Sequence, residues 1–213
     1  MRRAIASAVM AAVLAAGCGG SSHKSATTTH AASTPTTTAS GPATTSSAPE
    51  PAITRHLPTA SEIPPGFSPS GPPSVSTTIQ QLLTFDETPP SQMAPETAIY
   101  KRLGFVAAAS QGLNGAGGGG VANVEQFRSP AGARGELANS LATFDGGPGS
   151  RVNFSVPGVP HSGGWAGEGS DSGINVAFAA GDYYYLVGEE ANAPANRAGV
   201  IAAAQKLYHR VNG

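Results

Sequence analysis

A strand–turn–strand pattern at residues 173–190, GINVAFAAGDYYYLVGEE, constrains the fold of this chain more than any other feature. Ile174, Val176 and Phe178 alternate along its first arm, and the run Tyr183–Val187 forms the second. Between the arms, Ala180-Gly181-Asp182 has the composition of a tight turn. No other stretch is so dense in β-branched and aromatic residues. We therefore expect this hairpin to lie at the centre of a β-sheet.

Patterns of helices and further strands surround the hairpin. Helical spacing, capping residues and first-turn prolines predict helices at 76–85, 95–103, 129–144 and 194–211, and alternation predicts strands at 105–113, 121–128 and 152–156. Trp165 is expected on a short strand that leads to the hairpin. The last helix has the clearest apolar stripe, from Val200 to Val211. The pattern predicts an α+β domain in which helices cover one face of an antiparallel sheet, each returning over the strand before it.

A glycine-rich segment, Gly115 to Gly120, matches the spacing G-x-G-x-x-G. A dinucleotide-binding turn needs a helix immediately after it, so that the phosphates meet the helix N-terminus. Here a strand pattern follows, and no lysine supports a phosphate-binding loop. We therefore interpret the segment as a flexible hairpin loop.

The first residues have the pattern of an export signal. Met1-Arg2-Arg3 is basic, and Ala4 to Ala16 is an uncharged apolar run too short to span the ~30 Å hydrocarbon core as a helix. The run ends in Leu14-Ala15-Ala16-Gly17-Cys18, which resembles the lipobox of bacterial lipoproteins, with Ala15 where leucine is usual. The resemblance implies removal of a signal peptide of residues 1–17 and lipidation of Cys18. The alternative is an ordinary signal peptide with an incidental cysteine.

A stalk is predicted between the lipid anchor and the folded domain. Residues 18–57 consist, after Cys18, almost entirely of Ser, Thr, Ala, Pro and Gly. Such a segment buries too little apolar surface to offset the entropy of ordering, so we expect it to be disordered. As a random coil, ~40 residues have a root-mean-square span of roughly 35 Å. The single α+β domain is then expected at 58–213.

Charge and cysteine content exclude several classes of function. All 13 acidic residues lie at or after Glu50, whereas Arg2, Arg3 and Lys24 precede it, so the domain is mildly acidic. It contains no Lys/Arg cluster, and we therefore expect no binding to nucleic acid. With Cys18 as the only cysteine, neither an intramolecular disulfide nor a multi-cysteine metal site can form.

No motif in the domain predicts catalysis or a cofactor. His161 and His209 are its two histidines and do not form an H-x-x-x-H pair, so no zinc site is expected. Gly169-Ser170-Asp171-Ser172-Gly173 departs from G-x-S-x-G and is interpreted as an exposed turn. An acidic set around the hairpin lacks the spacing of a calcium loop and is interpreted as a solvated sheet edge; it comprises Glu168, Asp171, Asp182, Glu189 and Glu190.

Aromatic residues are the candidates for ligand binding. Trp165 and the run Tyr183, Tyr184 and Tyr185 are close to one another in the expected sheet. Consecutive strand residues point to opposite faces, so Tyr184 points away from its two neighbours. Partly exposed rings could stack on sugars or hold an apolar ligand. The alternative is that all four pack in the core.

Four segments resemble uncharacterised cell-envelope lipoproteins of high-GC Gram-positive bacteria, the actinobacteria. They are Arg102-Leu103-Gly104-Phe105-Val106, Phe127-Arg128-Ser129-Pro130-Ala131-Gly132-Ala133, Val156-Pro157-Gly158-Val159-Pro160 and Gly181-Asp182-Tyr183-Tyr184-Tyr185-Leu186-Val187-Gly188. The resemblance implies a lipid-anchored location at the outer face of the cytoplasmic membrane. It implies no activity, because that family has none established. More distantly, the layout resembles PsbP-like α+β domains, an analogy of fold alone.

Three functional hypotheses remain open from the sequence. The leading one is a non-catalytic, lipid-anchored domain that binds an unknown ligand or protein of the cell envelope. The first alternative is a lipid or glycolipid carrier, which needs an apolar cavity of several hundred Å³ between sheet and helices. The second is an envelope hydrolase, which needs Ser170 or Ser172 within hydrogen-bonding reach of His161 and a carboxylate.

Overall fold

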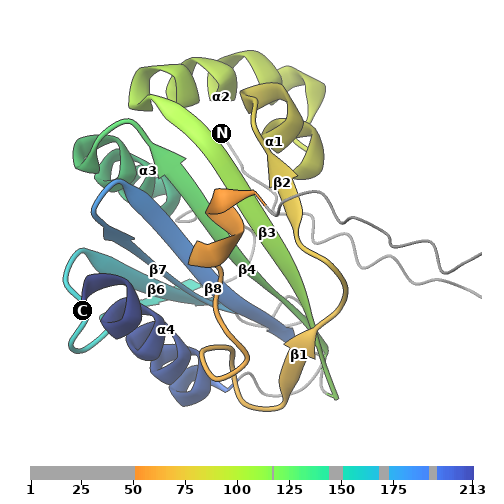
Figure 1. The fold of residues 1–213 in the computed structure, drawn as a ribbon, viewed down its shortest axis with the longest axis vertical. Helices are drawn as coiled ribbons and strands as arrows, with labels where there is room; N and C mark the ends of the chain where they lie inside the picture. The colour runs from red at the N-terminus through yellow and green to blue at the C-terminus, as the bar shows by residue number, and fades with distance from the viewer. Residues whose placement is uncertain (1–50, 117, 144–150, 168–172, 192–195) are drawn as a thin grey trace, which may run out of the picture. The chain divides into compact units, whose positions relative to one another are not determined.

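An antiparallel sheet of eight strands is the framework of the computed structural model, which describes residues 51–116, 118–143, 151–167, 173–191 and 196–213 (Figure 1). The strand order is β1-β3-β4-β8-β7-β6-β5, and β2 also pairs with β3. The strands are β1 (Phe67–Pro69), β2 (Ser74–Ser76), β3 (Phe105–Gly115), β4 (Gly118–Phe127), β5 (Arg151–Phe154), β6 (Ser162–Gly167), β7 (Gly173–Ala180) and β8 (Tyr183–Ala191). The predicted signal peptide, Cys18 and the predicted stalk up to residue 50 lie outside the described residues.

The hairpin of β7 and β8 lies at the centre of this sheet, as predicted. Ala180 is paired with Tyr183, so Gly181 and Asp182 alone make the turn. Gly181 has a φ of 56°, a conformation that glycine adopts without steric cost. β8 is the middle strand of the order and lies between β4 and β7.

Helices α1 (Ile79–Phe85), α2 (Pro90–Leu103), α3 (Pro130–Thr143) and α4 (Arg197–Asn212) pack on the sheet. Thr78 and Gln81 form a capping box at the start of α1, and Asn196 caps α4 by accepting from the Gly199 N–H. Pro90, not Pro95, occupies the first turn of α2, so this helix begins five residues earlier than expected. None of the described helices is long and apolar enough to cross a membrane.

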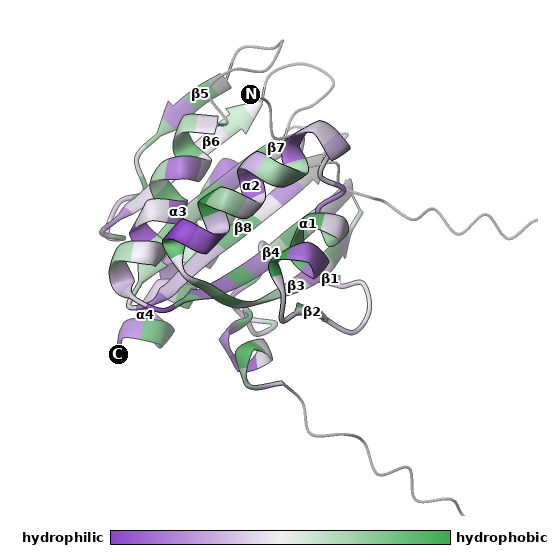
Figure 2. Cartoon of the chain, turned by 90° about the horizontal axis from the view of Figure 1, so that it is seen from above, coloured by the Kyte–Doolittle hydropathy of each residue, from purple (hydrophilic) through white to green (hydrophobic). Residues whose placement is uncertain are grey.

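The helices cover both faces of the sheet, which corrects the expectation of one covered face. α4 packs with Val176, Phe178, Tyr185 and Val187, whereas α1, α2 and α3 pack with Ala177, Ala179, Tyr184 and Leu186 on the opposite face. Figure 2 shows α4 apart from α1 and α2, across the sheet. The physical reason is that both hairpin arms are apolar at consecutive positions. Neither face of the central strands could therefore be left in water.

The folded domain also includes residues that the sequence assigned to the stalk. Residues Ala52–His56 form a 3₁₀-helix, η1, and Ile53 and Leu57 are buried in the core shared with α4. Ile63 and Phe67 then pack on Leu113 and Ala122 farther along the same face. We call residues 51–65 the lead-in segment. These buried apolar side chains, although few, tie it to the sheet.

The glycine-rich segment is mostly strand, which corrects its interpretation as a loop. Gly118, Gly119 and Gly120 belong to β4, and Gly115 is paired with Gly118 across the turn. A Cβ atom on Gly120 would lie 2.7 Å from the Gly188 carbonyl oxygen. The absence of a side chain thus permits close approach of β4 and β8.

Candidate functional site

The aromatic residues predicted to bind a ligand are divided between the two faces. Trp165 and Tyr184 belong to the core on the α1–α3 face and are 2% and 3% exposed. Tyr185, which is 1% exposed, and Tyr183 lie on the α4 face. Tyr183 alone is partly exposed. It is therefore the member of this set that an outside ligand could reach without opening the core.

Several other candidates lie outside the described residues: Cys18, Glu168, Ser170, Asp171 and Ser172. The hydrolase hypothesis depends on Ser170 and Ser172 and therefore stays a prediction. His161 itself is exposed in a turn. Glu189 is buried on the central strand, where its carboxylate accepts a hydrogen bond from the Asn196 N–H. Burial raises the pKa of Glu189, and that hydrogen bond opposes the shift.

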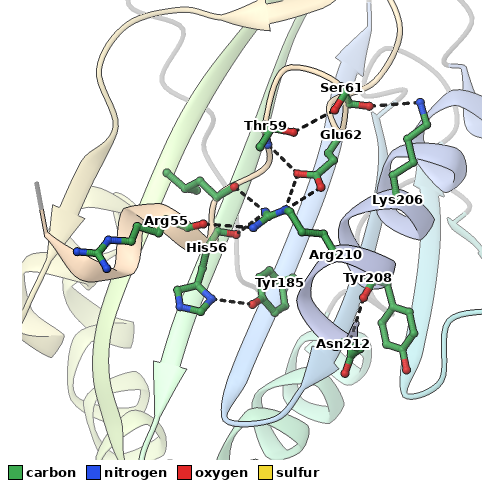
Figure 3. Close-up of polar contacts among 11 residues, drawn as sticks. Arg55, His56, Thr59, Ser61, Glu62, Tyr185, Lys206, Tyr208, Arg210 and Asn212 are labelled. Carbon is green, nitrogen blue, oxygen red and sulfur yellow. Dashed lines mark hydrogen bonds and ion pairs between the residues drawn. The ribbon is translucent and has the colours of Figure 1, made fainter.

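An arginine at the end of α4 holds the lead-in segment against the domain (Figure 3). Arg210 Nε donates to both carboxylate oxygens of Glu62, at 2.7 and 2.9 Å. Its Nη atoms donate to the carbonyls of Arg55 and Leu57, at 3.3 and 2.9 Å. The Thr59 N–H also donates to Glu62, at 2.8 Å. We call this set of contacts the Arg210 latch; it joins the beginning of the described chain to its last helix.

His56 extends the latch to the central hairpin. Its ring stacks on Tyr183 with 4.0 Å between centroids, and its Nδ1 lies 3.3 Å from the Tyr185 hydroxyl. Burial, followed by the positive charge of Arg210, lowers the pKa of His56, and Asp182 opposes this shift. Burial likewise raises the pKa of Tyr185. The neutral form of His56 therefore fits this position best.

On the opposite face, a depression lies beside α1, and we call it the α1 depression. Its interior has room for about one water molecule, and the rest of it opens to solvent. Its polar side chains are Ser74, Ser76, Asp86, Ser110, Asn123 and Glu125. Leu82, Phe85, Ala108 and Ala109 complete the lining, and Phe85 is 47% exposed.

Strand pairing explains why these polar side chains gather. Ser74 is paired with Ser110, and Ser110 with Asn123, so one row crosses β2, β3 and β4. The next row, Ser76, Ala108 and Glu125, lies two residues along on the same face. The last turn of α1 brings Leu82, Phe85 and the capping residue Asp86 over both rows.

Two side-chain hydrogen bonds fix the floor of the depression. Ser110 Oγ donates to Asn123 Oδ1 at 2.5 Å, and the Tyr100 hydroxyl donates to Glu125 Oε1 at 3.3 Å. Ser76, Ser110 and Glu125 are all buried. None of the residues that line the depression is a lysine, arginine or histidine. The polar part of the lining therefore consists mainly of hydroxyl, amide and carboxyl groups.

Sequence reasoning did not find this site because its residues come from four separate segments. The one local signal was the alternation of Asn123 and Glu125 in β4, which places two polar side chains on the same face between Val121 and Phe127. Only the pairing of β2 with β3 brings the serines beside them.

Among solved structures, the chain is similar to the extracellular domain of PknH from Mycobacterium tuberculosis. The TM-score is 0.47 and the sequence identity 19%, over 75% of this chain and 94% of that chain. Neither a protein-family model nor a curated protein sequence matches the chain.

Proposed function

We propose that this protein is a lipid-anchored extracytoplasmic binding domain that captures a small polar ligand in the α1 depression. The anchor is the diacylglyceryl group on Cys18, and the Ser/Thr/Pro-rich residues that follow carry the domain away from the membrane surface. Supporting this arrangement, the lead-in segment, which directly follows the stalk sequence, is fixed to the domain by the Arg210 latch. The stalk is thus joined to a segment that is itself bound firmly to the domain.

The observation that carries the binding role is the burial of Ser76, Ser110 and Glu125 around an open space. Buried polar side chains need hydrogen-bond partners, and Asn123 and Tyr100 provide them for Ser110 and Glu125, so that their positions are fixed. A recess lined by polar side chains in fixed positions is typical of a site that binds a small polar group.

The carrier hypothesis receives no support from the described residues. The apolar side chains of both faces pack against one another, and the α1 depression has room in its interior for about one water molecule. A lipid would need several hundred Å³. The hydrolase hypothesis rests on Ser170 and Ser172, outside the described residues. We therefore propose neither.

The anchor is tested in cells that express the chain and are fed an alkyne analogue of palmitate. We expect the label on the protein in the membrane fraction, and mass spectrometry should place the acyl groups on Cys18. The Cys18→Ala variant should lose the label and leave the membrane. Unlabelled wild-type protein, or label that persists in the variant, would contradict the anchor.

Binding is tested on the full chain carrying Cys18→Ala, labelled with ¹⁵N. The probes are glucose, n-butylammonium chloride and sodium butyrate, which are neutral, cationic and anionic. We expect at least one of them to shift the backbone amide signals of Ser110 and Glu125. If all three leave these signals in place, the depression is not a binding site for small polar molecules.

A further inference from the structure

We propose that the outer side of α2 and α3 binds the anionic phospholipid surface of the membrane. This contact is separate from the α1 depression and comes in addition to the proposed lipid anchor. It follows from the charges that this side of the domain exposes, from those that it lacks, and from the size of the side chains between them.

Four basic side chains gather where α2 ends and α3 begins. Lys101 and Arg102 lie in the last turn of α2, Arg128 directly follows β4, and Arg134 lies in the second turn of α3. All four are exposed. We call these four residues the basic surface.

Backbone contacts bring the three segments of the basic surface together. The Arg128 N–H donates to the Gly104 carbonyl at 2.9 Å, so Arg128 adjoins the residue that ends α2. Gly132 and Gly135, in the first two turns of α3, lie directly against Leu103, where a Cβ atom would collide with it. Figure 2 shows the two helices side by side on the sheet. Every residue of the basic surface is therefore close to this junction.

No exposed carboxylate offsets these charges on either helix. α2 and α3 contain one glutamate each, Glu96 and Glu136, which are 8% and 0% exposed. At the same end of the sheet, Asp182 is partly exposed and accepts a hydrogen bond from Gln126 at 3.5 Å. None of the four basic side chains forms an ion pair with another described residue. The positive charge is therefore unbalanced here, although the domain as a whole is mildly acidic.

The side chains between these charges are short. Apart from the basic residues, every exposed position on the two helices is Ala, Pro or Ser; examples are Ala94, Ala98, Ala131 and Ala138. Short side chains let a broad surface such as a bilayer approach both helices at once. The longer Lys and Arg side chains extend past them and can reach phosphate oxygens, which a guanidinium group binds through two hydrogen bonds.

An exposed valine adds an apolar contact beside the charges. Val106 follows the same junction, at the irregularity in the pairing of β3 with β4, and is 41% exposed. An apolar side chain next to cations suits the boundary between lipid headgroups and acyl chains. A soluble acidic polymer offers no such apolar region, so Val106 favours a bilayer as the partner.

The proposed anchor also favours the bilayer. As a random coil, the predicted stalk of ~40 residues has a span of roughly 35 Å, so it keeps the domain near the membrane without fixing its orientation. At the resulting high local concentration, weak attraction suffices. Each Lys or Arg beside an anionic leaflet strengthens binding about fivefold. Four such residues on one side therefore turn that side to the membrane.

The experiment uses the ¹⁵N-labelled full chain with Cys18→Ala, so that no lipid anchor contributes. It is mixed with vesicles that contain a gadolinium-chelating lipid, made either from phosphatidylglycerol and phosphatidylcholine or from phosphatidylcholine alone. We expect the anionic vesicles to broaden the amide signals of Arg102 and Arg128 more than that of Lys206 on α4. The effect should disappear at about 1 M salt, where the Debye length is about 3 Å. Binding through the apolar residues 4–16 would not single out these signals.

Charge-matched variants separate the basic surface from overall charge. Arg102→Gln with Arg134→Gln should weaken flotation with anionic vesicles about 25-fold, because two charges of about fivefold each are lost. Arg55→Gln with Lys206→Gln removes two exposed charges on the α4 side and should leave binding within about twofold. An unchanged amide signal of Val187 establishes that each variant is folded.

Three outcomes would overturn the inference. They are equal broadening by vesicles of phosphatidylcholine alone, equal loss of binding in both double variants, and a response of the basic surface to sodium polyglutamate but not to vesicles. The last outcome would assign the basic surface to an acidic polymer. None of them bears on the α1 depression or on lipidation of Cys18, which have their own tests.

Discussion

The polar side chains on the two faces of the sheet have different surroundings. On the α4 face, Arg210 gives its hydrogen bonds to Glu62 and to backbone carbonyls of the lead-in segment. On the α1 face, Ser76, Ser110 and Glu125 border an open space. The first set of contacts joins two distant parts of the chain, whereas the second set of side chains lines a depression that opens to solvent. We therefore assign attachment to the first face and recognition to the second.

The largest expected effect is that of Arg210→Ala on stability. The substitution leaves the buried Glu62 carboxylate without its arginine and removes donors to the lead-in carbonyls. We expect a loss of about 2–3 kcal/mol in the free energy of unfolding, measured with urea on the full chain. The exposed Arg134→Ala on α3 is the control and should cost less than about 0.5 kcal/mol. A latch variant as stable as this control would remove the basis for assigning attachment to the α4 face.

Acidification should loosen the latch in a window set by His56. The pKa of folded His56 lies below its ordinary value of 6.5, so between the two values the unfolded chain binds more protons. Stability should therefore fall as the pH drops below about 6.5 and level off once folded His56 is protonated. In His56→Gln this loss should be absent. Urea unfolding at a series of pH values gives the free energy of unfolding of both proteins. If the two curves fall in parallel below pH 6.5, His56 is not the cause of the loss.

Glu62 should cause a second loss of stability, at more acidic pH, in both the wild type and His56→Gln. Burial by itself raises the pKa of Glu62, but the hydrogen bonds from Thr59 and Arg210 outweigh it and lower the pKa below 4.5. The stability that Glu62 contributes is then fully present above pH 4.5 and is lost as the pH falls through the folded value. Glu62→Gln should flatten the curve below pH 4.5 and leave the His56 window in place.

Tyr185→Phe tests the contact between His56 and the hairpin. The hydroxyl lies 3.3 Å from His56 Nδ1, a long hydrogen bond, so its removal should cost about 0.5–1 kcal/mol at neutral pH. In a His56→Gln background the cost should shrink, because the partner is altered. Thermal unfolding of the two single variants and the double variant measures this coupling. Equal costs in both backgrounds would mean that the two groups do not interact.

The sequence predicted the framework well because local signals agree with it. Gly181 and the dense apolar arms defined the central hairpin, and the caps and stripes defined four helices. What it could not predict depends on long-range pairing. Consecutive apolar residues such as Tyr184 and Tyr185 indicate that both faces of the central strands are covered. The prediction of one covered face did not take this into account. The depression needs β2 beside β3, a pairing that Ser74 and Ser76 alone do not reveal.

The smallest expected effect on stability belongs to the α1 depression. Ser110→Ala removes one neutral hydrogen bond to Asn123, whose side chain is partly exposed and can bond to water instead. We expect a change below about 0.5 kcal/mol in urea unfolding, well under that of Arg210→Ala. Val124→Thr is the contrasting control: it buries a hydroxyl on the opposite, fully covered face and should cost about 1–2 kcal/mol. If Ser110→Ala instead costs as much as the latch variant, the polar side chains of the depression serve the fold, and the contrast between the two faces is lost.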